Sequence, residues 1–375
     1  MNKQYSLYLD IVRFLASLLV VLDHFNQSQI VNAITGKFVP ELGRESVIIF
    51  FILSGYVIAY TTDIKQQLLK DYIVARCARI YSVALPVLVI AFLLNYIGST
   101  YSPHPVAPSY QVAKAYLYLP FHILFLGEIW NLSEVPPWLV PYWSLGYEVW
   151  YYVLFAALYY FSSYKRIVIA GIVFLILGHK LWLLLPIWTS GVLLFHWQNK
   201  FPLSVTIARL GCAISVLALC VYKYLGWDHD LHALGTSIWP FKSLLLGSAS
   251  RYLADYVVGL IVLTNFYCAR YAQFTILEKF SHVIRSVSSY TFTLYLVHML
   301  VISIWLRVYL HDATSSKDIA IVSALIAFFT YIVGAFTEHK KQWFAAMFDR
   351  MLSFIEQLFS KVTNWLNNFP RMPSA

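Results

Sequence analysis

The stretch YLDIVRFLASLLVVLDHF (residues 8–25) decides the fold class, because it is long and apolar enough to cross a membrane. A helix needs about 20 residues, within a range of ~17–25, to cross the hydrocarbon core of a bilayer. Asp10, Arg13, Asp23 and His24 nevertheless interrupt this apolar run. A charge near the bilayer centre costs at least ~2.5–3.5 kcal/mol, so such residues usually face a protein interior or a watery cavity. The stretch therefore predicts a first membrane helix with a functional polar face.

The composition of the whole chain agrees with a membrane protein. Of its 375 residues, 60% are hydrophobic and only 12% are charged, whereas soluble domains have roughly 45–50% and 25%. The 12 Trp and 28 Tyr residues suit anchoring at lipid interfaces. Basic residues collect in the cytoplasmic loops of membrane proteins, which explains the net charge of +9. The sequence has no block of Lys and Arg of the kind that binds nucleic acid. The four cysteines follow no disulfide or metal-binding pattern, so neither is predicted.

The apolar runs predict an all-α integral membrane protein with about ten transmembrane helices. Residues 111–129 and 235–250 are predicted to be half-buried or re-entrant, although either would change the count if it spanned. Loops on the N-terminal side carry more Lys and Arg than those on the other side, which predicts cytoplasmic N- and C-termini. The predicted spans are 7–25, 46–61, 80–98, 142–161, 166–179, 181–197, 204–224, 254–270, 289–308 and 319–337.

The chain is expected to consist of one membrane domain, residues 1–338, followed by a tail, residues 339–375. Apolar residues recur at helical spacing in the tail, which predicts an amphipathic helix lying in the membrane interface. Residues 99–141 form a long outer segment rich in Pro and Trp. A lid or acceptor platform and a structural cap are equally good interpretations of this segment.

Three of the ionisable residues of the first span lie on one helix face. Arg13 and His24 are only ~20° apart in projection and ~16 Å apart along the axis. Asp10 is within ~40° of His24, whereas Asp23 points ~100° away from it. The polar stripe thus places Arg13 toward the cytoplasm and His24 toward the outer side. An interhelical salt bridge with a packed His accounts for the stripe equally well.

The segment ARCARIYSVALP (residues 75–86) places Arg76 and Arg79 one helical turn apart at the cytoplasmic entrance of the third span. Paired guanidinium groups suit a phosphorylated ligand, because Arg binds phosphate oxygens in a fork. A purely topological anchor is the other interpretation, and on this motif alone it is the stronger one.

The segment PYWSLGYEVWYYVLF (residues 141–155) carries Ser144 and Glu148 one helical turn apart, preceded by Trp143. Glu148 enters from the outer face to a predicted depth near that of His24, so the two side chains are candidates for an acid–base pair. The alternative is a Glu that pairs with an Arg elsewhere.

Two further histidine-containing segments have less specific interpretations. SSYTFTLYLVHMLVI (residues 288–302) places His298 in mid-span, where a packing role is more common than chemistry. DHDLH (residues 228–232) has the residue types of a metal site, but a solvated outer loop is the better interpretation, and no metal is predicted.

Taken together, these stretches resemble the acyltransferase 3 family of integral membrane acyltransferases across residues 7–338. The family often has a further Arg where Ala75 stands and a Pro where Ser82 stands. The hydrolase-like domain that is fused to some members is not expected here. The resemblance rests, in chain order, on LDIVRFLASLLVVLDH, FFILSGYVIA, ARCARIYSVALP, WSLGYEVWYY, SYTFTLYLVH and TEHK.

The resemblance implies transfer of an acyl group, usually acetyl, from cytoplasmic acyl-CoA to a hydroxyl of an envelope or exported glycan. It implies acetyl-CoA as a substrate rather than a tightly bound cofactor, a glycan or lipid-linked glycan acceptor, and a multi-pass location among the lipids of the cytoplasmic (inner) membrane. By motif, His24 matches the catalytic histidine, Arg13, Arg76 and Arg79 match the essential donor-binding arginines, and Glu148 matches the motif glutamate. Asp10, Ser144, Trp143 and His298 are supporting candidates.

The residues themselves suggest a reason for this arrangement. A neutral His is a suitable base near pH 7, and the arginines suit the phosphates of CoA, whose long arm would then follow the first helix to His24. His24 would either activate the acceptor hydroxyl or carry the acyl group covalently. A proton-coupled transporter also places ionisable residues in spans, but usually shows repeated halves, which are not found. A glycan polymerase or ligase and a non-catalytic sensor are further alternatives.

Overall fold

The computed structural model describes residues 2–101 and 109–367, and every regular element within them is helical. The predicted all-α fold is therefore confirmed. Each predicted span coincides with a helix, and the following list gives their bounds. These helices are α1 (Lys3–Gln27), α3 (Gly43–Lys65), α4 (Leu69–Tyr101), α7 (Tyr142–Tyr160), α8 (Ser163–Leu177), α9 (His179–Trp197), α10 (Val205–Tyr224), α12 (Tyr252–Ala269), α15 (Thr291–Val308) and α16 (Ser316–Phe336).

Shorter helices fill the connections between them. The two segments predicted to be half-buried or re-entrant hold short elements: α5, α6 and η1 in the first, and the end of α11 and η2 in the second. Part of the outer segment, residues 102–108, lies outside the described residues. The remaining elements are α2 (Ala33–Gly36), α5 (Tyr110–Ala113), α6 (Ala115–Ile123), η1 (Leu126–Glu128), α11 (Trp227–Ile238), η2 (Gly247–Ala249), α13 (Ile276–Lys279), α14 (Ser281–Ser288), η3 (Glu338–Lys340) and α17 (Lys341–Asn367).

Seven helices of the described part are long and apolar enough to cross a membrane, which makes the chain a multi-pass membrane protein. The pair α8 and α9 bends by 118°, and it adds an eighth crossing if it forms one broken span. The many Tyr and Trp side chains of α7 lower its apolar character, and α7 is not among the seven. The count of about ten spans and the cytoplasmic location of both termini stay predictions.

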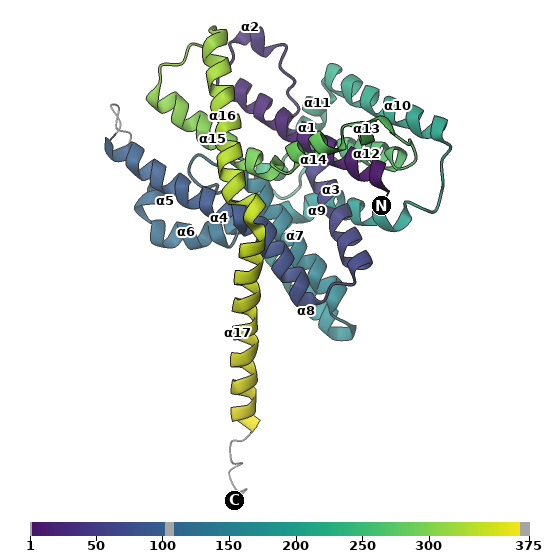
Figure 1. Cartoon of the computed structure of the whole chain (residues 1–375), viewed down its shortest axis with the longest axis vertical. Helices are drawn as coiled ribbons and strands as arrows, with labels where there is room; N and C mark the ends of the chain where they lie inside the picture. The colour runs from purple at the N-terminus through teal and green to yellow at the C-terminus, as the bar shows by residue number, and fades with distance from the viewer. Residues whose placement is uncertain (1, 102–108, 368–375) are drawn as a thin grey trace, which may run out of the picture.

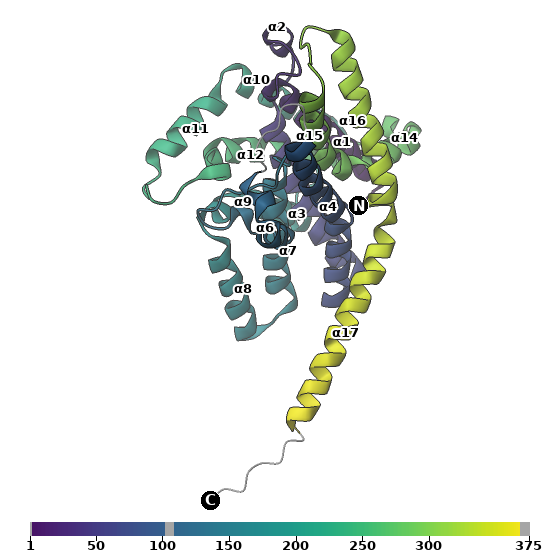
Figure 2. The same ribbon diagram turned by 90° about the vertical axis from the view of Figure 1, so that its left-hand side faces the viewer.

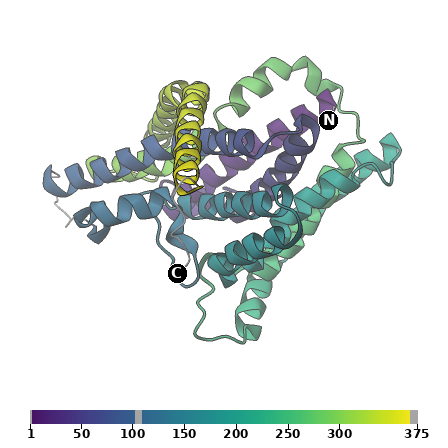
Figure 3. The same cartoon turned by 90° about the horizontal axis from the view of Figure 1, so that it is seen from below.

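The tail forms the helix α17, which continues almost in line with α16 and projects beyond the other helices (Figure 1). A view from the side shows the same projection, with α10 and α11 on the opposite side of the molecule (Figure 2). The helix α17 packs along α4, and the view from below shows the two helices side by side (Figure 3). Lys70 of α4 contacts Asp349, Ser353 and Glu356 of α17. The interfacial location of this helix stays a prediction, and residues 368–375 lie outside the described residues.

The helix α3 lies at the centre of the bundle, where it packs against α1, α7, α9 and α12. Glycines allow the backbones of α3 and α9 to touch. A Cβ atom on Gly55 would overlap the carbonyl oxygen of Trp188, and one on Gly191 would overlap that of Ile52. Small residues permit this close approach between helices within a membrane. The α3–α9 contact holds the residues of α3 that line the site described below.

Gly191→Ala is expected to destabilise the protein, because the new methyl group must push α3 and α9 apart. Overpacking of this kind costs about 1–3 kcal/mol. Thermal unfolding of the detergent-solubilised chain would measure the loss. Gly171→Ala on α8 is a matched control, because no atom lies within 4 Å of its added Cβ. Equal melting temperatures for the two variants would contradict the close α3–α9 contact.

Candidate active site

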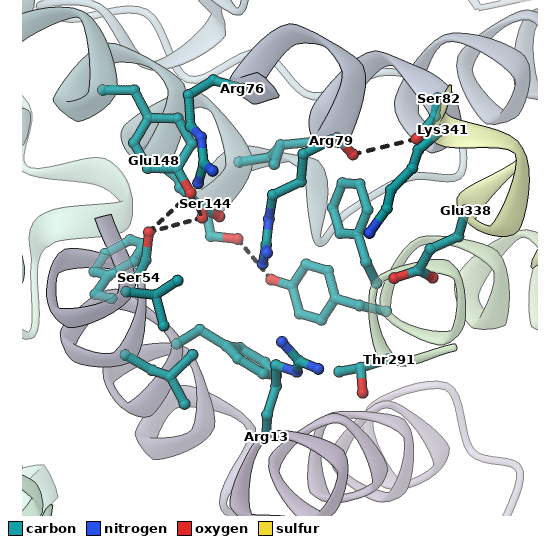
Figure 4. A pocket seen from close by; sticks show the side chains of 18 residues that line it. Arg13, Ser54, Arg76, Arg79, Ser82, Ser144, Glu148, Thr291, Glu338 and Lys341 are labelled. Atoms are coloured by element: carbon teal, nitrogen blue, oxygen red, sulfur yellow. Dashed lines mark hydrogen bonds between the residues drawn. The ribbon is translucent and has the colours of Figure 1, made fainter. Parts of the chain in front are cut away.

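A cavity of about 110 Å³ between α1, α3, α4, α7 and α15 gathers most of the predicted site residues (Figure 4). We call it the arginine cavity. Its polar walls come from helices that are far apart in the sequence, and the C-terminal segment closes one side with Glu338 and Lys341. The predicted site residues that line it are Arg13, Arg76, Arg79, Ser144 and Glu148.

The three arginines of the cavity lack a full set of partners. Arg13 donates to Asp10 and to the carbonyl oxygen of Ser288, both at 3.2 Å. Among the described residues, no ion pair involves Arg76 or Arg79, and the buried Nε atoms of Arg13 and Arg76 have no hydrogen-bond acceptor. Unsatisfied buried donors are costly. The cavity therefore suits an anionic ligand.

Glu148 lines the arginine cavity near Arg76 and is held by hydroxyl groups (Figure 4). Ser54 donates to its Oε1 at 2.8 Å, and the Tyr152 hydroxyl donates to the same atom. The ring of Tyr152 also lies 5.8 Å from the guanidinium of Arg76. Ser144, one turn before Glu148, instead shares a hydrogen bond of 2.6 Å with the hydroxyl of Tyr295.

His24 lines a second cavity, which we call the His24 cavity, at the far end of α1 from Arg13. Trp143, another supporting candidate, lines this second cavity, with the guanidinium of Arg44 4.8 Å from its ring. Tyr295 contributes to the walls of both cavities and stands between them. The phenol of Tyr295 therefore lies between His24 and the three arginines of the arginine cavity.

The imidazole of His24 is oriented by His298. Nδ1 of His24 lies 2.9 Å from the carbonyl oxygen of Val20 and 3.1 Å from Nε2 of His298. Nδ1 of His298 lies 2.9 Å from the carbonyl oxygen of Leu294. Carbonyl oxygens only accept, so in the neutral rings both Nδ1 atoms carry the proton and Nε2 of His298 accepts from His24. Nε2 of His24 is then the unprotonated nitrogen.

The predicted acid–base pair of Glu148 and His24 is corrected by the structure, which places the two side chains in different cavities. His24 lies in the last turn of α1, whereas Glu148 lies in the second turn of α7. The His24 partner is His298, which is fully buried and which the sequence favoured as a packing residue. Depth estimated helix by helix does not show which side chains meet.

A third cavity, the inner vestibule, adjoins the arginine cavity near the start of α1 and shares Arg13 and Arg79 with it. Asp10, a supporting candidate, lies here beside Arg13. Exposed Arg285 and Lys341 add positive charge. The vestibule therefore offers a cationic approach to the arginine cavity.

Glu128 is a further residue of the His24 cavity, and no sequence motif singled it out. It accepts from the buried Lys180 at 2.9 Å and from Ser248 at 2.6 Å. Burial raises the pKa of the Glu128 carboxyl, although Lys180 and Ser248 favour its ionised form. The only signal for it in the sequence was Lys180, which stands between two apolar runs, because a lysine at such a position requires a buried acidic partner.

The DHDLH segment is helical rather than a loop, which corrects that part of the sequence interpretation, although His229 and Asp230 are solvent-exposed as predicted. It begins the helix α11, and Asp228 is buried between Lys223, at 2.6 Å, and Arg251, at 3.1 Å. Within residues 2–101 and 109–367, no group of three or more His, Cys, Asp or Glu side chains is arranged to hold a metal ion.

The fold and the cavities thus define a helical multi-pass membrane protein with a buried cationic cavity and a separate histidine cavity. The chain belongs to the acyltransferase 3 family, because the family model described as "Acyltransferase domain" matches residues 6–350. No curated protein and no solved structure gives a significant match. The resemblance noted in the sequence is therefore confirmed, and it identifies a membrane acyltransferase.

Proposed function

We propose that the protein transfers an acyl group, in the simplest case acetyl, from cytoplasmic acyl-CoA to a hydroxyl of a surface, periplasmic or exported glycan. The observation that carries the proposal is the order of the cavities. A cationic vestibule leads to the arginine cavity, and Tyr295 alone is shared between that cavity and the one holding His24. The protein would act in the cytoplasmic membrane.

The donor would bind with its phosphates at the arginines. Arg13 and Arg79 face both the vestibule and the arginine cavity, and Arg76 has an unsatisfied Nε. Guanidinium groups form strong, charge-assisted hydrogen bonds with phosphate. The pantetheine arm would then cross the apolar part of the arginine cavity, lined by Phe51 and Leu145, toward Tyr295. Rotation of the Tyr295 side chain would admit the thioester to His24.

The chemistry would take place at Nε2 of His24, the nitrogen left without a proton by the contacts of Nδ1. This atom takes the proton of the acceptor hydroxyl while the hydroxyl oxygen bonds to the thioester carbonyl carbon. The carbon–sulfur bond then breaks, and the CoA thiolate takes the proton back from the imidazolium. In the alternative route, Nε2 itself attacks and an acyl-histidine forms first. Rapid-quench trapping of labelled protein separates the routes, because direct transfer leaves no covalent label.

His298 acts in this proposal as a positioning residue. His298→Ala is expected to lower kcat about 10–100-fold, equivalent to ~1.4–2.8 kcal/mol, because Nδ1 of His24 keeps the Val20 carbonyl but loses the side chain that fixes the orientation of its ring. The KM for acyl-CoA should stay the same. His298→Gln should restore part of kcat, because its side-chain oxygen can accept from Nδ1 of His24. A parallel rise in donor KM would point to a structural role instead.

The test uses inverted membrane vesicles from the native host, supplied with acetyl-CoA labelled in the acetyl group. Label that enters a glycan or lipid-linked glycan fraction in the presence of the wild-type chain would support the proposal. If no label appears although acceptor is present, succinyl-CoA is tested next. Absence of transfer from both donors would overturn the proposal and favour a transporter.

A further inference from the structure

A fourth cavity, of about 530 Å³, adjoins the His24 cavity and is almost entirely polar in its lining side chains. We call it the ion-pair cavity. Asp23, Gln27, Arg44 and Arg251 line both it and the His24 cavity, so the two cavities are adjacent. Its volume lies within the range of roughly 300–1,000 Å³ that is typical of small-ligand sites.

Two buried carboxylates and two cations form the wall of the ion-pair cavity. Lys223 lies 2.6 Å from Asp228 and 3.3 Å from Glu45. Arg251 lies 3.1 Å and 3.7 Å from the same two carboxylates. Glu45 and Asp228 are each only 2% exposed. All four contacts use one oxygen of each carboxylate, Oε1 of Glu45 and Oδ2 of Asp228.

The other polar atoms of this wall are left without partners. Oε2 of Glu45, Oδ1 of Asp228 and Nε of Arg251 are buried, and no group in the described chain hydrogen-bonds to them. Burial alone would raise the pKa of Asp228. Its hydrogen bond and attraction to Lys223, together with the charges of His229 and Arg251, outweigh burial, so the pKa lies below its ordinary value. Asp228 is thus an ionised acceptor. Unsatisfied charged groups of this kind are costly unless a ligand completes them.

The mixture of unsatisfied atoms indicates the chemistry of the ligand. An anion would satisfy only the Arg251 donor, and an ammonium group would satisfy only the carboxylates. A hydroxyl donates and accepts at once, so neighbouring hydroxyls match all three atoms. The lining side chains carry equal numbers of acidic and basic groups, which favours a ligand without net charge, and Arg44 among them is also paired with Asp255. The acidic groups are Asp23, Glu41, Glu45 and Asp228, and the basic groups are Lys37, Arg44, Lys223 and Arg251.

We infer that the ion-pair cavity binds an uncharged sugar unit of the acceptor glycan, next to the unit whose hydroxyl reaches His24. The inference rests on the proposed function and adds to it the class of acceptor, a neutral glycan, and the residues that recognise it. Glu45 and Asp228 accept hydrogen bonds from its hydroxyls, and Arg251 donates to them. Binding through this cavity places the acceptor on the opposite side of Tyr295 from the arginine cavity.

The test measures sugar binding to the purified full-length chain, without acyl transfer. Saturation-transfer NMR with cellobiose and methyl β-galactoside, and with methyl β-glucuronide and glucosamine as charged comparisons, reports which probes bind. The neutral glycosides are expected to bind saturably and more tightly than the charged ones. Glu45→Gln and Asp228→Asn, which preserve side-chain shape, should each weaken this binding at least tenfold. Glu278→Gln is the matched control, because Glu278 bonds Gln4 near the opposite end of α1.

Binding of CoA to the same samples separates this inference from the proposed function. Neutral-glycoside binding that is absent, or equal in wild type and both variants, overturns the inference even when CoA binds normally. Loss of CoA binding and of transfer in the wild type overturns the proposed function, whereas sugar binding would still support the cavity assignment. If one variant fails to fold, as a thermal melt would show, the other variant and the comparison of charged with neutral probes decide the result.

Discussion

His24→Ala is expected to abolish acyl transfer in the vesicle assay. The substitution removes the only imidazole that faces the His24 cavity within the described residues, and with it the base or acyl carrier of the proposed reaction. Loss of a general base costs about 10²–10⁴-fold in rate, and loss of a nucleophile removes the covalent route altogether. The measurement is label in the glycan fraction at matched expression levels.

The His24→Ala variant should still bind CoA as the wild type does, because the three arginines of the arginine cavity lie on the other side of Tyr295. His282→Ala, which changes an exposed histidine of α14, serves as the control and should retain transfer. Transfer that survives in His24→Ala would refute the assigned chemistry. Loss of both transfer and CoA binding would instead show that the substitution disturbs the bundle.

Arg79→Ala is expected to weaken the use of acyl-CoA more than any other change in the arginine cavity. Arg79 lines both the inner vestibule and the arginine cavity, and among the described residues it has no ion-pair partner of its own. A hydrogen bond to a charged group contributes about 1.5–3 kcal/mol, which corresponds to roughly a 10–150-fold rise in donor KM. The measurement is the dependence of transfer on acyl-CoA concentration.

Arg79→Lys should recover only part of the affinity, because a lysine ammonium cannot form the bidentate fork. Arg166→Ala is the control, since the exposed Arg166 of α8 donates to the carbonyl oxygen of Phe161, away from the cavities. A fall in kcat at constant donor KM would remove Arg79 from phosphate binding. One departure from the family pattern, Ser82, lines the same cavity.

The positions of the helices follow directly from the sequence. Each of the ten predicted spans coincides with a helix, because long apolar runs interrupted by polar loops have few other folded forms in a membrane. The polar stripe of α1 was also predictable, since helical periodicity alone places Arg13 and His24 on one face. The family followed from the order of the short motifs and is confirmed over residues 6–350.

The sequence by itself thus determined the helices, the faces of single helices and the family, whereas the tertiary structure decided which faces meet. Glu148 lies with the arginines, His298 orients His24, and Asp228 is buried in an ion-pair network. Periodicity describes one helix at a time and contains no information about its neighbour. The neighbour is set by packing, as where Gly55 and Gly191 bring α3 against α9. Contacts between distant segments depend on that packing and could not be predicted from local pattern.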